Sequence, residues 1–259
     1  MNKLLIATTA AVALATVGTA GAADLPVKAP PMVAAAPIAS WTGCWISGGI
    51  GYGMYNQDHS EFFLNGAQDS FNQTSGGRGW LGRAGVGCDY QVAPQFVIGA
   101  FGDYDWESIK GDHAVSLFTF PFVGNEKLSR SWAAGGRVGY LPFPNLLTFV
   151  SGGWTQAHFD AYNLALNFVG GGPALLGVNA TTRNGWFIGG GTEYRLPWAQ
   201  NLTWKTEYRF SDFRDQTDTI FILGTNVPFE NTQSHKYVQT VTTSLVWRFD
   251  FGGPVIARY

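Results

Sequence analysis

The feature that most constrains this chain is a two-residue alternation of side-chain character that recurs from Trp41 onward. In one such run, Trp80 and Tyr90 share one parity, whereas Arg83 and Asp89 share the other. Successive side chains of a β-strand point to opposite faces of its sheet, so the pattern predicts strands with one apolar and one charged face. Because no segment of useful length shows helical periodicity, we expect an all-β protein.

Eight such runs follow one another, and the connections between them are alternately long and short. Short turns at one end, long loops at the other and an even number of strands are typical of bacterial outer-membrane barrels, in which both chain ends lie in the periplasm. We therefore expect an eight-stranded antiparallel up-and-down transmembrane β-barrel. The expected strands cover residues 41–55, 77–92, 95–108, 128–141, 146–159, 184–196, 202–213 and 236–250. The expected long loops cover residues 56–76, 109–127, 160–183 and 214–235.

The composition fits a barrel wall better than a soluble domain or a helical membrane protein. Charged residues make up 13% of the chain and aromatic residues 15%, whereas about a quarter of an ordinary soluble chain is charged. The mean hydropathy is nevertheless close to zero, because apolar and polar residues alternate along a barrel wall and cancel in the average. The net charge of −2 gives no reason to expect a nucleic-acid partner.

Residues 1–23 have the features of a signal peptide, with Lys3, an apolar core over residues 4–17 and small residues before the cleavage point. The alternative is a permanent helical anchor, but the apolar run is short and no charged stop follows it. We expect residues 24–40, rich in Pro and Ala, to form a periplasmic linker, and residues 41–259 to form the barrel.

The spacing of aromatic residues predicts the height of the apolar wall. Trp80 and Tyr90 are ten residues apart on one face, and so are Phe96 and Trp106. Ten residues at about 3.3 Å each, tilted by about 40°, rise roughly 25 Å, which is the height of the apolar band between the two aromatic girdles of such barrels. The predicted girdle residues are Trp80, Tyr90, Phe96, Trp106, Trp132, Tyr140, Trp186, Tyr194, Trp204, Tyr237 and Trp247.

Several segments carry a resemblance to a known family. Residues 41–49 read WTGCWISGG and resemble an opening strand of the pattern WTGFYxGG, after residues 24–26, which resemble the usual mature start. Residues 189–194 and 205–208 resemble a GxGxEY…KxEY hairpin, and residues 247–250 resemble the end of a last strand, YRFDW. In this order the motifs are similar to the small outer-membrane β-barrel proteins of alphaproteobacteria, a porin-like family of surface antigens and hemin-binding surface proteins. The resemblance implies the outer membrane of a Gram-negative bacterium.

The two cysteines depart from the family pattern at corresponding heights. In an antiparallel hairpin whose loop is centred near residue 66, Cys44 and Cys88 lie opposite each other on the lipid-facing parity, near the periplasmic end. Facing residues have Cβ atoms about 4.5–5.5 Å apart, so we predict a disulfide, with two free thiols as the alternative. Phe101 stands where the family has an interior glutamate, which counts against an open aqueous channel.

The charged parity is expected to face the interior of the barrel. An eight-stranded barrel is only wide enough for its own side chains. We therefore favour a closed, salt-bridged lumen in which Glu193 and Lys205 lie side by side, with a narrow channel for small solutes as the alternative. The predicted lumen charges are Arg83, Asp103, Asp105, Arg137, Glu193, Arg195, Lys205, Glu207, Arg209 and Arg248.

The four histidines fall in or near the long-loop side of the barrel. Imidazole ligates metals and heme iron, so His59, His113, His158 and His235 are candidate ligands. No two of them have the spacing i, i+2 or i, i+4. We therefore expect neither a cofactor nor a resident metal, and we keep heme binding only as a less favoured function.

The last strand carries a candidate assembly signal. Leu245, Trp247 and Phe249 share the outward parity and the chain ends in Tyr259, a pattern that resembles the signal read by the outer-membrane assembly machinery. The alternative is that the residues after the glycines at 252–253 form a periplasmic tail. A lipid-modifying enzyme would need a nucleophile and a base within hydrogen-bond reach, and no recognisable Ser/His spacing occurs, so no enzymatic activity is expected.

These patterns favour a structural and surface-facing role in the cell envelope. The expected partners are outer-membrane lipid and the assembly machinery, whereas the sequence does not identify an external ligand. A small-solute porin is the second hypothesis. A soluble lipocalin-like binding barrel is the third, and it would have an apolar interior and a charged exterior, the reverse of the arrangement that Lys205 and Glu207 indicate.

Overall fold

The computed structural model describes residues 40–116, 121–167, 171–199 and 201–249. The described residues form ten strands and no helix. The strands are β1 (Gly43–Phe63), β2 (Gln73–Ala93), β3 (Phe96–Ser116), β4 (Pro121–Phe143), β5 (Leu146–Phe159), β6 (Tyr162–Leu166), β7 (Ala174–Val178), β8 (Thr181–Arg195), β9 (Leu202–Ile222) and β10 (Pro228–Phe249). No helix among the described residues is long and apolar enough to cross a membrane. The predicted signal peptide, most of the linker and Tyr259 lie outside the described residues.

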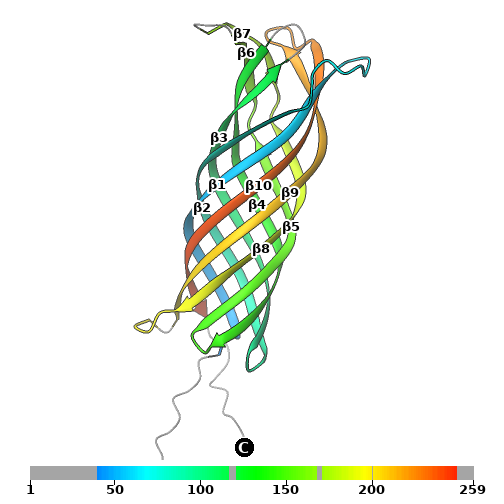
Figure 1. Cartoon of the computed structure of the whole chain (residues 1–259). Coiled ribbons are helices and arrows are strands. Elements are labelled where there is room, and N and C mark those ends of the chain that lie inside the picture. The colour runs from blue at the N-terminus through cyan, green and yellow to red at the C-terminus, as the bar shows by residue number, and fades with distance from the viewer. Residues whose placement is uncertain (1–39, 117–120, 168–170, 200, 250–259) are drawn as a thin grey trace, which may run out of the picture. The chain divides into compact units, whose positions relative to one another are not determined.

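The eight long strands close into an antiparallel barrel (Figure 1). Neighbouring strands pair in the order β10, β1, β2, β3, β4, β5, β8 and β9, and β9 pairs with β10 to complete the ring. Each strand therefore has a partner on both sides, and closure leaves no edge with unpaired backbone groups. The eight-stranded antiparallel up-and-down barrel predicted from the sequence is confirmed.

The two ends of the barrel differ. At one end, which we call the turn end, short connections follow β2, β4 and β8, and the start of β1 pairs with the end of β10 at Cys44 and Phe249. At the other end, which we call the loop end, the remaining connections lie, together with the short strands β6 and β7 (Figure 1). Both ends of the described barrel chain thus lie at the turn end.

The prediction of four long loops is wrong, because the strands continue through most of those residues. The β1–β2 ladder runs on to the pair His59 and Gln73, and the β9–β10 ladder continues to the pair Phe221 and Pro228. The two-residue alternation persists there, but polar residues such as Asp58 and Ser60 take the outward positions. Without a contrast between apolar and polar residues, a polar strand is difficult to distinguish from a loop in the sequence.

Strands β6 and β7 were also predicted as loop. They form a small hairpin that pairs with β4 on one side and with β9 on the other. An apolar cluster fills the interior at this level, formed by buried Val115, Phe122, Leu164, Leu176, Val178 and Ile220. The hairpin therefore extends the wall of the barrel and its core beyond the ends of β5 and β8.

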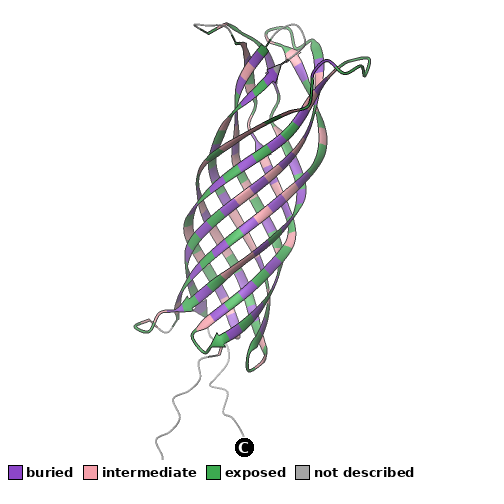
Figure 2. Cartoon of the chain, viewed as in Figure 1, coloured by how far each residue is buried: buried purple, intermediate pink, exposed green. Residues whose placement is uncertain are grey.

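Burial alternates along every long strand, as the striped ribbons of Figure 2 show. On β5 apolar residues occur on both parities, so the sequence alone does not assign its outward face. In the structure Leu147 and Phe149 are buried, whereas Val150 is 63% exposed and Trp154 also points outward. Glycine lets the strands approach closely inside so narrow a barrel. A Cβ atom on Gly111, for example, would lie 2.0 Å from the carbonyl oxygen of Gly76.

Candidate functional site

The outward positions of the eight long strands form an uncharged band, which we call the apolar belt. None of its residues is Asp, Glu, Lys, Arg or His, and large apolar side chains such as Ile188 and Val150 are more than half exposed. The belt comprises the outward positions within residues 44–54, 80–90, 96–106, 132–140, 146–154, 186–194, 204–210 and 237–249. An exposed apolar surface that encircles a protein is not stable in water, so it must contact an apolar medium or another molecule.

A ring of aromatic side chains closes the belt toward the loop end, and each of the eight long strands contributes to it. Some neighbours in the ring are in contact: the ring centroids of Trp132 and Trp154 are 4.4 Å apart, and Phe210 stacks on Tyr237 at 5.9 Å. The members of this ring are Tyr52, Trp80, Trp106, Trp132, Trp154, Trp186, Phe210 and Tyr237. A second group lies toward the turn end: Tyr90, Phe96, Tyr140, Tyr194, Trp204 and Trp247.

The predicted girdle residues all lie on outward positions, and all but the half-buried Tyr237 are exposed. The sequence reasoning missed Tyr52, Trp154 and Phe210. Trp154 was missed because the parity of β5 was ambiguous. Tyr52 and Phe210 could have been found, because they share the outward parity of their strands with residues already assigned to the girdle.

Outward charges begin directly beyond the aromatic ring. Arg78 lies two residues past Trp80, Arg130 lies two residues past Trp132, and Asp212 lies two residues past Phe210, in each case toward the loop end. The change from uncharged to charged residues thus occurs at one level on three strands around the ring, β2, β4 and β9. That is the arrangement expected where an apolar medium ends and water begins.

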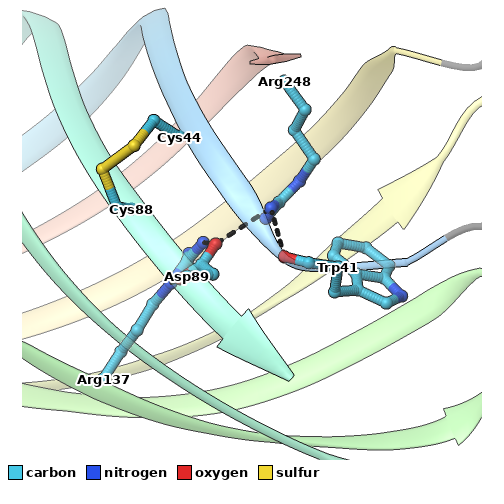
Figure 3. The surroundings of a disulfide bond; sticks show 6 residues. All are labelled: Trp41, Cys44, Cys88, Asp89, Arg137 and Arg248. Atoms are coloured by element: carbon cyan, nitrogen blue, oxygen red, sulfur yellow. Dashed lines mark hydrogen bonds and ion pairs between the residues drawn. A yellow bond between two sulfur atoms is a disulfide. The ribbon is translucent and has the colours of Figure 1, made fainter. Parts of the chain in front are cut away.

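Inside the barrel, charged side chains form buried networks. At the turn end Arg137 donates two hydrogen bonds to Asp89, at 2.8 and 2.5 Å, and Arg248 donates to the same carboxylate at 2.9 Å (Figure 3). Both arginines also reach Glu193, at 3.2 and 2.8 Å, and Thr203 donates to it at 2.6 Å. Two carboxylates and two guanidinium groups therefore neutralise one another out of contact with water.

A second network fills the middle of the lumen. Arg83 binds Asp105 through two nitrogens, at 2.7 and 2.6 Å. Arg209 also donates from two nitrogens to the two carboxylate oxygens of Asp103, and it reaches Glu207 at 2.9 Å. Paired contacts of this kind fix both groups in one geometry, which stiffens the interior.

The structure brings nine of the ten predicted lumen charges into these networks. The tenth is Arg195, which donates to the Ser40 carbonyl oxygen at 3.0 Å and stacks over Trp41 at the turn end. Glu193 and Lys205 are paired across the β8–β9 ladder as predicted, but the ion pair of Lys205 is with Glu207, at 3.3 Å.

Several interior charges were missing from the predicted network. Asp89 has the same parity as Arg83 and could have been included. Lys236 with Glu126, and Arg183 with Asp218, pair in the part of the barrel near the loop end, at 2.6 and 2.7 Å. Glu126, Arg183 and Asp218 lie in ranges that had been predicted as loops, whereas Lys236 is the first residue of the predicted last strand.

Little free volume remains among these side chains. A pocket inside the lumen, bordered by Arg83, Glu107, Ser131 and Arg209, has a volume of about 10 Å³, which is about the room for a single water molecule. Above it lies an apolar layer that contains Tyr55, Leu81, Ile109, Leu128, Ala157, Phe159, Phe213 and Val238. A layer of charged side chains is thus followed by a layer of apolar side chains along the barrel axis.

The four histidines do not gather on one surface. His59 and His113 point inward near the loop end and are buried, with ring centroids 4.3 Å apart. His158 and His235 lie on outward positions, on β5 and β10. Each of the four lies in a strand, toward the loop end of the barrel. The two inward histidines share their surroundings with Glu61, which is also buried.

Two of these histidines, both beyond the aromatic ring, have shifted pKa values. Burial, together with the positive charge of nearby His59, Lys236 and Arg183, holds the pKa of His113 well below its usual range. Burial opposes the shift at His235, but hydrogen bonds with Asp212 and Asp215, each at 2.8 Å, raise its pKa above the usual value.

Cys44 and Cys88 form a disulfide, as predicted. They are direct partners in the β1–β2 ladder, and both side chains lie on the outward side of the wall. Figure 3 shows the disulfide at one side of the strands and the charged groups of Asp89, Arg137 and Arg248 at the other. The candidate assembly residues Leu245, Trp247 and Phe249 also point outward and are exposed.

No family model matches this sequence, and no curated protein matches it. Among solved structures, the outer membrane protein OprG from Pseudomonas aeruginosa is similar with a TM-score of 0.47 and 10% identity, over 83% of this chain and 99% of that one. The outer membrane protease OmpT from Escherichia coli gives 0.45 and 10%, over 79% and 97%. Ail of Yersinia pestis, described as an attachment invasion locus protein, gives 0.35 and 10%, over 80% and 99%. Likenesses at this level do not assign an activity.

Proposed function

We propose that this protein is a structural barrel of a Gram-negative outer membrane, with a closed lumen and with its loop end exposed outside the cell. The observation that carries the proposal is the distribution of charge across the wall. Charged residues are absent from the outward positions of the apolar belt and are concentrated and paired on the inward positions. A charge at the middle of a bilayer costs roughly 2–4 kcal/mol, so a wall without outward charges is the one expected in lipid.

The orientation follows from the two ends of the barrel. Short turns face the periplasm in barrels of this type, and here they lie with both ends of the barrel chain. The loop end, whose outward positions carry Arg78, Asp58 and other polar residues, then projects beyond the membrane as a water-exposed extension. The partners in this proposal are lipid around the belt and, during biogenesis, the assembly machinery.

A closed lumen is favoured over a small-solute pore by the way the interior is filled. The pair of Arg209 with Asp103 crosses the lumen from β9 to β3, and the pair of Arg83 with Asp105 joins the neighbouring strands β2 and β3 beside it. A solute could pass only if these buried pairs separated, and breaking a buried pair costs about 3–5 kcal/mol. The proposed role is therefore mechanical and surface-facing, without transport or catalysis.

The test is conductance in planar bilayers after fractionation of the cell envelope. We expect the protein in the outer-membrane fraction, with gel migration that changes on heating, and no stable single-channel steps from the wild type. Arg83→Ala together with Arg209→Ala removes the two bidentate cations and serves as the opened control. Stable, reproducible steps from the wild type, of the same size as in the control, would overturn the closed-lumen proposal.

A further inference from the structure

Three potential metal ligands converge inside the loop end of the barrel. His59 and Glu61 are successive inward residues of β1, and His113 projects inward from β3. One ligand atom from each lies within 4.8 Å of the others. All three side chains are almost completely buried, with exposed fractions of 3% for His59, 0% for Glu61 and 2% for His113.

Both histidine rings are held by one nitrogen and have a second nitrogen without a partner. His59 Nε2–H donates to the Ala114 carbonyl oxygen at 3.0 Å, whereas its buried Nδ1 has no hydrogen-bond partner among the described residues. His113 Nδ1 contacts the side-chain amide of Gln57 and lies 3.3 Å from the Ser75 hydroxyl, whereas its buried Nε2 likewise has none. A ligating histidine is typically oriented in this way, by a hydrogen bond from its other ring nitrogen.

The carboxylate of Glu61 has a similar division of roles. Its Oε2 accepts hydrogen bonds from Ser70, at 2.5 Å, and Gln73, at 3.2 Å. Its Oε1 has only a long contact from the Thr232 hydroxyl, at 3.4 Å, and lies 3.8 Å from His59 Nε2. One oxygen is thus anchored, and the other lies beside the His59 ring.

We propose that His59, Glu61 and His113 bind a divalent first-row transition metal, with Zn²⁺ as the ion that fits the donor set best. Two imidazoles and one carboxylate are borderline donors that suit such ions, whereas Ca²⁺ and Mg²⁺ prefer oxygen ligands alone. In a tetrahedral zinc site the ligand atoms are about 3.3 Å apart. Binding therefore draws the three side chains together by roughly an ångström and leaves a fourth position for water.

The surroundings tolerate the added positive charge. The two nearby cations are each paired with a carboxylate, Lys236 with Glu126 at 2.6 Å and Arg183 with Asp218 at 2.7 Å, which weakens their repulsion of a bound ion. A pocket of about 390 Å³ on the outer surface is lined in part by His59 and its neighbours on β1. The depth of the cluster excludes a porphyrin, so the site is one for an ion rather than for heme.

The experiment is a Co²⁺ and Zn²⁺ titration of the full chain folded in detergent micelles and stripped of metal with a chelator. Co²⁺ should give visible ligand-field absorbance that saturates at one equivalent, and Zn²⁺ should abolish it by competition. His113→Gln and Glu61→Gln should each weaken binding by about tenfold or more, a loss of roughly 1.4 kcal/mol for each tenfold. The double variant His158→Gln with His235→Gln, which alters only the outer histidines, should bind like the wild type.

A measurement on the wild type guards against variants that do not fold. With ¹⁵N-labelled histidine, one equivalent of Zn²⁺ should shift the imidazole signals of two histidines and leave the other two in place. The proposal is overturned if the wild type shows no saturable binding. It is equally overturned if all four signals shift together, or if the folded His113→Gln variant binds as well as the wild type while the outer double variant does not.

Discussion

The apolar belt and the loop-end extension are built from the same long strands, yet their two faces follow different patterns. In the belt, outward residues are uncharged and inward residues include paired charges such as Arg137 with Asp89. In the extension, outward residues such as Arg78 and Asp58 are charged, and the interior combines an apolar layer around Ile109 with buried ion pairs. The residues of the two faces are therefore determined by different requirements. Outward residues must suit the surrounding solvent, and inward residues must fill a narrow space.

This difference matters for stability because charge has a different cost in each place. A buried charge with its partners in place is tolerated, whereas one left alone is strongly destabilising. An outward charge costs little in water and several kcal/mol in lipid. Substitutions that add or remove a charge in each of these environments test this difference directly.

The largest effect is expected from Glu193→Ala. It removes the carboxylate that Arg137 and Arg248 share, and leaves uncompensated buried positive charge at a cost of about 3–5 kcal/mol. Equilibrium urea unfolding of the folded barrel measures the loss. The matched control is Glu230→Ala in the extension, where burial and the neighbouring Asp69 and Glu61 raise the pKa of the carboxyl to about 8.

A carboxyl with a pKa of about 8 is largely uncharged at neutral pH, so removal of Glu230 leaves no cation without its partner, and its cost should be well below that of Glu193→Ala. Equal losses for the two variants would show that the turn-end network is not held by charge neutralisation.

A smaller effect is expected from an outward arginine placed in the belt. Val150→Arg introduces a charge between the two aromatic groups and should destabilise the barrel in lipid vesicles by about 2–4 kcal/mol. Gln233→Arg is the control, because it places the same side chain on an exposed position of the extension. It should change the free energy of unfolding by less than about 0.5 kcal/mol. If both variants lose the same free energy, the belt and the extension do not differ in solvent.

The smallest effect concerns the pH dependence of the extension. His235 bonds to Asp212 and Asp215, which raise its pKa, so the protonated ring is favoured in the folded state. Its contribution is fully present below the unfolded pKa, about 6.5, and is lost as the pH rises through the folded pKa. Between pH 6 and pH 8 the wild type should therefore lose slightly more stability than His235→Gln, by less than about 1 kcal/mol for a surface pair. Parallel pH profiles for the two proteins would count against this ion pair.

The sequence was sufficient for the belt and insufficient for the extension, for one physical reason. Where lipid is the expected outer solvent, the two parities differ in polarity, so Trp80 and Arg83 could be assigned to opposite faces. In the extension the parities of Asp58 and His59 are both polar, and the continuation of β1 was predicted as a loop. The hairpin of β6 and β7 was missed in the same way, because short strands give little periodic signal.

The candidate site was predicted only in part because it depends on contacts across several strands. Cys44 and Cys88 face each other across one hairpin, so their pairing could be deduced from the position of the intervening loop. The convergence of His59 with His113 depends on the register of β1, β2 and β3 in a region that was not predicted as strand. Parity alone could have placed Asp89 in the lumen, but not its two arginine partners.

The measurement that tests the central claim most directly is the accessibility of a nitroxide spin label on the outer face, in barrels reconstituted into lipid vesicles. One label replaces Val150 in the belt and another replaces Gln233 in the extension. The account predicts that the label at 150 is relaxed by oxygen and protected from a water-soluble nickel complex, and that the label at 233 shows the reverse. A label at 150 that the nickel complex reaches as readily as the one at 233 would contradict the claim that lipid surrounds the belt.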